Sequence, residues 1–131
     1  MRLEHVSNKS SGQPFAIELE ANEVRALRAA LGEVCFGFRL EEFTAHIGMG
    51  EERACMLFER LNGLDLNRRA VLPTTPEELL ALRNAHAETL KELGVEEYST
   101  RTGLDFQEGE ALLRALDENL GSCGIRRNSI D

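Results

Sequence analysis

The sequence predicts an all-α fold in which two tandem tri-helical repeats form one compact globule behind an extended or hairpin N-terminal arm. Residues 23–62 align with residues 78–117 at a constant offset of 55, without gaps, and 11 of the 40 aligned pairs are identical. With this composition, chance would give about three identities. Both copies also carry apolar residues at helical spacing. Helix-capping residues precede two helices of the second copy.

These observations predict five segments along the chain. They are an N-terminal arm (1–20), a first helical repeat (21–62), a linker (63–75), a second helical repeat (76–120) and a mobile tail (121–131). The arm holds two alternating stretches, around Arg2–Val6 and at Phe15–Leu19. An isolated two-stranded hairpin is only marginally stable in water. We therefore expect either a hairpin or an extended arm that lies against the helices.

Three apolar stripes define the helices of the first copy. The first stripe consists of Val24, Leu27, Leu31, Val34 and Phe38. The second consists of Leu40, Phe43 and Ile47, and the third of Ala54, Leu57, Phe58 and Leu61. Spacings of three and four residues place each set on one helical face. We expect Gly48 to end the second helix.

The second copy repeats this plan with clearer start signals. Thr75 precedes Pro76 and stands three residues before Glu78, which is the pattern of a capping box. Asp105 and Glu108 have the same spacing, and a glycine, Gly94, stands where the first helix should end. Gly109 replaces an alanine inside the last helix. Because glycine is the poorer helix former, the sequence predicts that Gly109→Ala stabilises the protein by about 0.5–1 kcal/mol.

Composition narrows the class of protein. The 131 residues are 42% hydrophobic and 29% charged, as in a folded domain, and their net charge of −8 argues against a nucleic-acid partner. There is no secretory signal and no apolar run of about 18 residues, so we expect no association with a membrane. Three widely spaced cysteines, an odd number, favour a reducing cytoplasmic location.

The segment from Glu42 to Leu61 places a glycine, Gly48, before apolar residues that follow it by six, ten and thirteen positions, and the second copy does the same after Gly103. This spacing resembles the helix-turn-helix core of many bacterial regulators, which implies that the third helix reads DNA. Both third helices, however, begin with acidic residues, which repel phosphates. A DNA-binding regulator is therefore an alternative hypothesis. Its phosphate contacts would be Arg68, Arg69, Arg126 and Arg127.

No pattern in the sequence indicates catalysis. No serine, cysteine or lysine has a recognisable base nearby, and the histidines His5, His46 and His86 lack the spacing of metal ligands. The acidic pairs Glu41–Glu42 and Glu96–Glu97 suit the first turn of a helix. The sequence therefore predicts a non-enzymatic protein without a cofactor or a metal.

Differences between the copies indicate contacts outside the shared fold. At four positions a residue that is apolar in one copy faces a charged residue in the other: Phe36 faces Lys91, Cys55 faces Glu110, Leu80 faces Arg25 and Phe106 faces Glu51. We expect these four apolar residues to lie at an interface between the repeats, in a homodimer or with another protein. Of the three largest, Phe36, Leu80 and Phe106, we expect at least two to lie between repeats or subunits.

The function that the sequence favours is an acidic, intracellular protein-binding module. One form of it is an antitoxin- or immunity-like inhibitor that covers a basic partner. A third hypothesis is a small-molecule sensor. Its polar pocket would consist of His86, Thr89 and Thr102, which replace apolar residues of the first copy.

Overall fold

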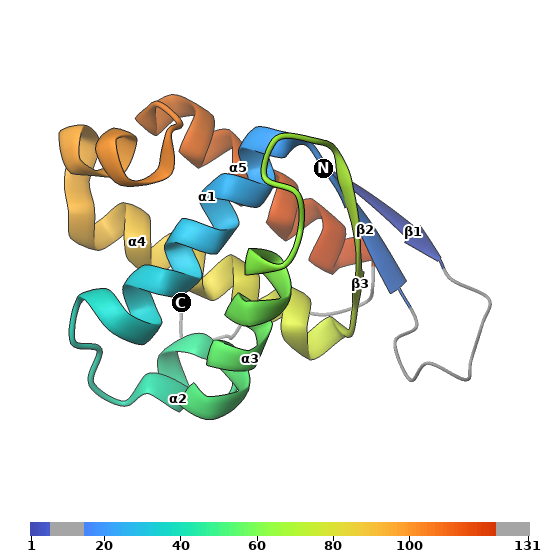
Figure 1. Ribbon diagram of the computed structural model, residues 1–131. Helices are drawn as coiled ribbons and strands as arrows, with labels where there is room; N and C mark the ends of the chain where they lie inside the picture. Colours follow the sequence, from blue (N-terminus) through green and yellow to red (C-terminus); the bar gives the residue numbers. More distant parts are fainter. Residues whose placement is uncertain (6–14, 123–131) are drawn as a thin grey trace.

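The computed structural model describes residues 1–5 and 15–122, and the side chains of residues 2–5 are left out of the description. Helices make up most of this part of the chain, as predicted. In chain order the elements are β1 (Arg2–His5), β2 (Phe15–Leu19), α1 (Ala21–Gly32), the π-helical turn η2 (Glu33–Gly37), α2 (Phe43–Ile47), α3 (Glu51–Asn62), β3 (Ala70–Thr74), α4 (Pro76–Thr102) and α5 (Phe106–Ser122). The strands lie along one side of the helices (Figure 1). The tail from residue 123, for which mobility was predicted, lies outside the described residues.

A three-stranded antiparallel sheet is the part of the fold that the all-α prediction did not include. Its order is β1-β2-β3, so the predicted N-terminal arm forms a hairpin and pairs in addition with residues from the predicted linker. In β3 the side chains alternate, with Leu72 and Thr74 buried and Val71 and Pro73 exposed. This alternation gives the strand one face toward the helices.

Several elements stand 55 residues apart, the offset of the sequence alignment. The strands β2 and β3, the helices α1 and α4, and the helices α3 and α5 each begin at that interval. The glycines Gly48 and Gly103 both have positive φ angles, of 99° and 82°. In the sheet, Ile17 pairs with Leu72, which is also its partner in the alignment extended by the same offset.

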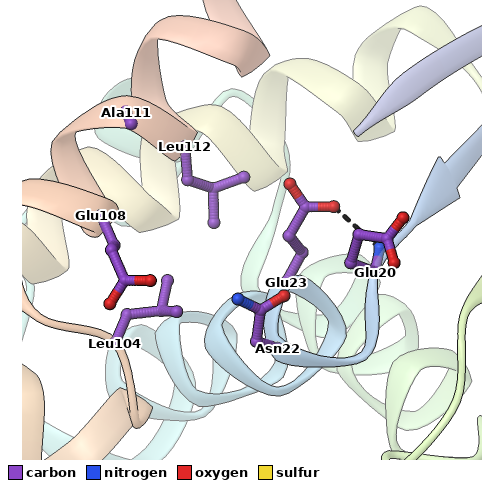
Figure 2. Close-up of a pocket in the computed structure, with 7 residues that line it drawn as sticks. All are labelled: Glu20, Asn22, Glu23, Leu104, Glu108, Ala111 and Leu112. Atoms are coloured by element: carbon purple, nitrogen blue, oxygen red, sulfur yellow. Dashed lines mark hydrogen bonds between the residues drawn. The ribbon is translucent and has the colours of Figure 1, made fainter.

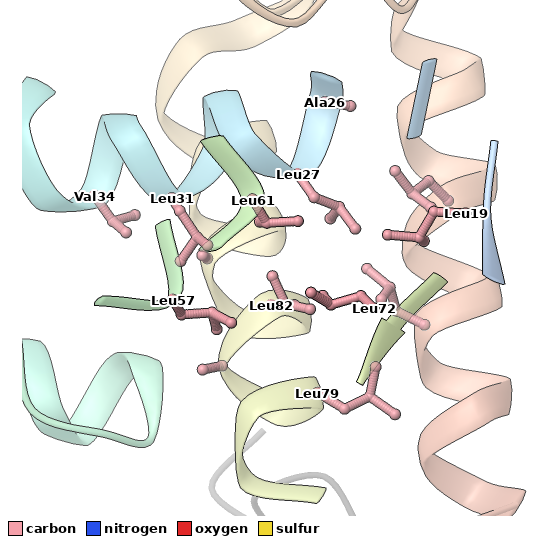
Figure 3. Packing of buried hydrophobic residues seen from close by; sticks show 14 of the residues in the cluster. Leu19, Ala26, Leu27, Leu31, Val34, Leu57, Leu61, Leu72, Leu79 and Leu82 are labelled. Carbon is pink, nitrogen blue, oxygen red and sulfur yellow. The ribbon is translucent and has the colours of Figure 1, made fainter. Parts of the chain in front are cut away.

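One hydrophobic core joins the elements of both predicted repeats. Leucines from α1, α3 and α4 meet there with leucines from the two paired strands (Figure 3). The labelled leucines are Leu19, Leu27, Leu31, Leu57, Leu61, Leu72, Leu79 and Leu82, each at most 2% exposed. Because each fully buried leucine contributes about 1.5–3 kcal/mol, the two halves stabilise each other.

Most of the predicted helix ends are present. The Thr75 hydroxyl accepts the Glu78 amide hydrogen at 3.1 Å while the Glu78 carboxylate accepts from the Thr75 amide at 3.0 Å. Asp105 and Glu108 form the corresponding pair at 2.8 and 3.1 Å. Gly94, with a φ of 72°, kinks α4 at the predicted helix end, although the helix resumes beyond it. Glycine, which has no Cβ atom, thus permits a backbone angle that other residues rarely adopt.

The structure argues against the expectation for Gly109, because tertiary packing there opposes helix propensity. A Cβ atom at Gly109 would overlap the Tyr98 ring, at 2.5 Å from both Cε1 and Cζ, and would also meet its hydroxyl. Tyr98 is fully buried between the rings of His86 and Phe106, with centroids 5.7 Å from each. Gly109 therefore lets the backbone of α5 approach this ring.

Candidate functional site

An exposed aromatic residue marks the candidate site. The side chain of Phe36, in η2, is 65% exposed and packs edge to face on Phe58 of α3, with ring centroids 5.4 Å apart. The thiol residues Cys35 and Cys55 lie beside these rings and are half-buried. We call these four residues the Phe36 surface. A cavity of about 380 Å³ adjoins it, lined by residues 34–40 and Glu51.

The backbone at Phe36 departs from ordinary α-helix. Phe38 donates its amide hydrogen to the Glu33 carbonyl at 3.0 Å, across one residue more than an α-helical bond spans. Such wide turns are rare and recur at functional sites. The corresponding residues 88–92 remain in α4, so this turn distinguishes the first copy. Gly37 suits the turn because a Cβ there would lie 2.6 Å from the Glu33 carboxylate.

Glu33 is itself held by an ion pair that spans the two halves. Its two carboxylate oxygens accept from the Arg101 guanidinium at 3.0 and 2.9 Å. The carboxylate, together with that of Glu97, raises the pKa of Arg101 above its ordinary value. The second half of α4 thereby anchors the turn that carries Phe36.

Several carboxylates lie close to the Phe36 surface in the sequence. Within the described residues, five exposed glutamates of α3 and the segment before α2 have no ion-pair partner: Glu41, Glu42, Glu51, Glu52 and Glu59. Among the nearby cations, Arg53 pairs with Glu77 and Arg60 pairs with Glu78, whereas Arg39, which lines the cavity, is exposed and has no ion-pair partner among the described residues. The five unpaired carboxylates outnumber this arginine, so the segment keeps a net negative charge that attracts basic groups.

The two thiols of this surface interact with each other. Burial is the main cause that raises the pKa of Cys35 to about 12, and the nearby Cys55 thiol and Glu51 carboxylate add to it. Cys35 is consequently a neutral thiol at physiological pH.

The second copy has a groove in the corresponding place, with different chemistry. A cavity of about 360 Å³ between α4 and α5 is lined by Leu90, Lys91, Phe106, Glu110 and Leu113, among others. Lys91 takes the place of Phe36 in the alignment, and Glu110 that of Cys55. At these two aligned positions the second groove has charged side chains where the first copy has apolar ones, whereas Arg39 and Glu51 supply the charges of the first cavity.

The four predicted interface residues do not gather at one place. Phe36 and Cys55 share the Phe36 surface, whereas Phe106 contacts Tyr98 of its own repeat. Leu80 lies beside Gly48 of the other repeat, where a Cβ on the glycine would be 3.5 Å from Leu80 Cδ2. Of the three large residues, Leu80 has an inter-repeat contact among those described here, and the placement of at least two of them between repeats or subunits stays a prediction.

The residues of the predicted polar pocket are buried in the core. His86 and Thr89 are 0% exposed and Thr102 is 4% exposed. Both threonine hydroxyls donate to helix carbonyls at 2.8 Å, Thr89 to Ala85 and Thr102 to Tyr98. None of the three lines any of the cavities of about 290–380 Å³ described here. Their side chains therefore do not offer a ligand an open site in this structure.

His86 is held as a neutral ring. Its Nε2 lies 2.9 Å from the Gly109 carbonyl and 3.3 Å from the Tyr98 hydroxyl. Because a carbonyl only accepts, Nε2 carries the hydrogen, and Nδ1 is buried without a hydrogen-bond partner. Burial lowers the pKa of His86, and the bond to Gly109 opposes this only in part.

The arginines of the DNA-binding hypothesis are dispersed. Arg69 pairs with Glu18 at 2.9 Å and with Glu20 at 3.0 Å, so its charge is compensated. Arg68 is exposed. Arg126 and Arg127 lie outside the described residues. The described part of the chain thus offers one exposed and one compensated arginine at these positions.

A third cavity, of about 290 Å³, is lined by carboxylates that bind other groups of the chain (Figure 2). Glu23 accepts from the Met1 ammonium at 3.0 Å and from the Glu20 amide at 2.8 Å. Glu108 caps the first turn of α5. These acids stabilise the chain's own helix starts and N-terminus.

The site could be found only in part from the sequence. The alignment pointed to Phe36 and Cys55, but the neighbour Cys35 was missed because its counterpart Leu90 is also apolar.

Among residues 1–5 and 15–122, no cluster of three or more potential metal ligands occurs. No helix in the same residues is long and apolar enough to span a bilayer. Comparison with protein-family models, curated proteins and solved structures finds no match to this chain.

Proposed function

We propose that this protein is a non-enzymatic binding module that uses the Phe36 surface to hold a basic protein partner. The observation that carries the proposal is the 65% exposure of Phe36 beside unpaired carboxylates. Aromatic residues anchor many protein interfaces. Scattered exposed aliphatic residues such as Val71 and Val95 need no such explanation.

The partner's chemistry follows from the surroundings of the ring. An apolar side chain would enter between Phe36 and the cavity beside it, and lysines or arginines around that side chain would meet Glu51, Glu52 and Glu59. A basic amphipathic helix has this arrangement. With a net charge of −8, the protein would also attract such a partner over a distance. An antitoxin- or immunity-like inhibitor in the cytoplasm is one setting for this chemistry.

We also propose that the two halves are copies of one strand-plus-three-helix unit, related by approximate two-fold symmetry. Reciprocal contacts support this proposal. Glu33 of the first half binds Arg101 of the second, while Glu88, the counterpart of Glu33, lies 3.3 Å from His46, the counterpart of Arg101. Within each half, the equivalent residues Arg28 and Arg83 bind the equivalent residues Asn62 and Asp117. A two-fold relation brings the same surfaces together in this way.

The binding proposal can be tested with a synthetic helical peptide composed of leucine and lysine. We expect amide resonances of residues 34–40 and 51–59 to shift on titration of the ¹⁵N-labelled protein. Phe36→Lys, which introduces the residue of the second copy, should weaken binding at least tenfold. The matched control is Val95→Lys, because Val95 is 64% exposed, close to the value for Phe36. This control should retain binding.

A leucine–glutamate peptide of the same length separates charge from apolarity. It should not bind, because its carboxylates would face those of α3. Equal binding of both peptides, or shifts that fall on other elements, would show that the Phe36 surface is not the recognition site.

DNA binding remains the competing hypothesis, and the described structure gives it little electrostatic support. The exposed outer side of α3 carries Glu52 and Glu59, while its Arg53 pairs with Glu77. A helix that reads DNA must instead approach phosphates with net positive charge. The acidic α3 thus favours a basic protein over a nucleic acid as the partner.

A further inference from the structure

Two cysteines from different elements meet at the base of the Phe36 surface. Cys35 is the third residue of η2, and Cys55 lies in the first half of α3. Both are half-buried free thiols, and Cys55 is close enough to Cys35 to raise its pKa. Cys35 and Glu51 line the same cavity, and Glu51 stands one helical turn before Cys55 on α3. The two thiols therefore lie where η2 meets α3, although they are 20 positions apart in sequence.

Aromatic packing holds the two elements in this relation. Phe36, next to Cys35, packs edge to face on Phe58, three residues after Cys55. One turn earlier, a Cβ at Gly32 would lie 3.2 Å from the Phe58 ring, so helix and ring are in close contact there. Packing between η2 and α3 therefore holds together the two elements that carry the thiols.

We propose that Cys35 and Cys55 form a reversible intramolecular disulfide by exchange with a low-molecular-weight disulfide such as glutathione disulfide. The linkage ties η2 to α3 beneath Phe36. It is a property of this pair alone, and it does not depend on the identity of the binding partner.

The exchange proceeds in two balanced steps. The Cys55 thiolate attacks one sulfur of the external disulfide, whose bond breaks, and the released thiolate takes up a proton. The Cys35 sulfur then attacks Cys55 Sγ, the mixed disulfide breaks, and the second external thiol leaves with the proton that Cys35 gives up. Two protein thiols are oxidised, and one external disulfide is reduced to two thiols.

The surroundings assign the order of the two thiols. The pKa of Cys35, raised to about 12, makes it a poor first nucleophile. It acts instead as the resolving thiol, because the adjacent Cys55 supplies a high local concentration of the mixed disulfide. Exchange should therefore be slow to begin and should pass through an adduct on Cys55.

The test uses the full chain with Cys123→Ser, because that third cysteine could otherwise enter the exchange. The protein is equilibrated with glutathione and glutathione disulfide at fixed ratios, quenched with acid, alkylated and mapped by mass spectrometry. We expect the loss of two hydrogen atoms and one peptide pair that joins residues 35 and 55. Cys35→Ala should instead accumulate a glutathione adduct on Cys55, and reductant should reverse every product.

A second measurement distinguishes a preorganised pair from two merely accessible thiols. Closing a loop of about 20 residues should lower the equilibrium constant for unfolding in urea by about 200-fold. By thermodynamic linkage, the effective concentration of one thiol at the other should be higher by the same factor in the folded protein than in the urea-unfolded chain. Accumulation of single adducts or intermolecular dimers in the native buffer would overturn the proposal, as would equal effective concentrations in the folded and unfolded chains.

Discussion

Replacing Gly109 by alanine should destabilise the protein, although it introduces a better helix former into α5. In a helix open to solvent, this change would contribute about 0.5–1 kcal/mol of stability. Here the new methyl group would stand 2.5 Å from two carbons of the Tyr98 ring. Either the ring or the helix has to move.

The cost of that movement exceeds the gain in helix propensity. Tyr98 is fully buried, and the rings of His86 and Phe106 both pack edge to face against it. Overpacking of a closed core costs about 1–3 kcal/mol. Subtracting the propensity term leaves a net loss of about 1 kcal/mol, which corresponds to a fall in Tm of about 3–5 °C for a domain of this size.

Urea unfolding monitored by circular dichroism measures this loss, and the same helix offers a matched control. Around Gly121, a Cβ would meet no atom within 4 Å, so Gly121→Ala should be neutral or stabilising by up to about 0.5 kcal/mol. In a Tyr98→Leu background, Gly109→Ala should change sign and become stabilising, because the ring that it would strike is gone. A raised midpoint for Gly109→Ala in the otherwise unchanged chain would refute the packing argument.

Three further predictions concern other parts of the molecule. Because His86 takes up a proton more readily in the unfolded chain, the free energy of unfolding should fall by about 1.4 kcal/mol per pH unit below about pH 6.5, until the lower folded-state pKa is reached. Tyr98, the titratable group in contact with His86, stays neutral because burial raises its pKa to about 12. Urea unfolding of His86→Leu at a series of pH values should lack this pH-dependent component. Leu80→Arg should lower the free energy of unfolding by about 1–2 kcal/mol in thermal unfolding, because it disturbs the contact beside Gly48. Phe36→Lys, at an exposed position, should lower it by less than about 0.5 kcal/mol. Similar losses for the two variants would contradict the difference in burial between these positions. Gel shifts at about 50 and 200 mM salt should give no specific DNA complex, and one with sub-micromolar affinity that survives the higher salt would reinstate the regulator hypothesis.

The helix ends could be predicted because their causes are local. Thr75 and Glu78 form their capping box within one turn, and Gly94 permits the backbone angle that interrupts α4. The strand β3 could not be predicted on the same basis. Its residues 70–74 pair with β2, more than 50 residues away, and the segment contains a proline that is unusual within a strand. Only the fold brings that partner into reach.

The alignment of the copies predicted the candidate site unevenly, for a related reason. It identified Phe36 correctly as a residue outside its own repeat's core, since Lys91 is tolerated at the equivalent position. For Phe106 the same argument missed a local change. The larger ring of Tyr98 and the small Gly109 reshape this region, and Phe106 packs on that ring, a local contact that the alignment did not indicate.

The asymmetry between the two grooves argues that the first copy carries the recognition surface. The cavity beside Phe36 is lined by η2, the segment that follows it and the start of α3, whereas the aligned groove between α4 and α5 has neither an exposed phenylalanine nor a π-helical turn. In the second copy, ordinary helix continues through Lys91, and that side chain is solvated. In the first, the wide turn holds Phe36 in solvent while Arg101 fixes Glu33 at the turn's start. An exposed phenylalanine contributes little to stability and favours association. Its position on an anchored turn, among unpaired carboxylates, is therefore better explained by binding than by folding.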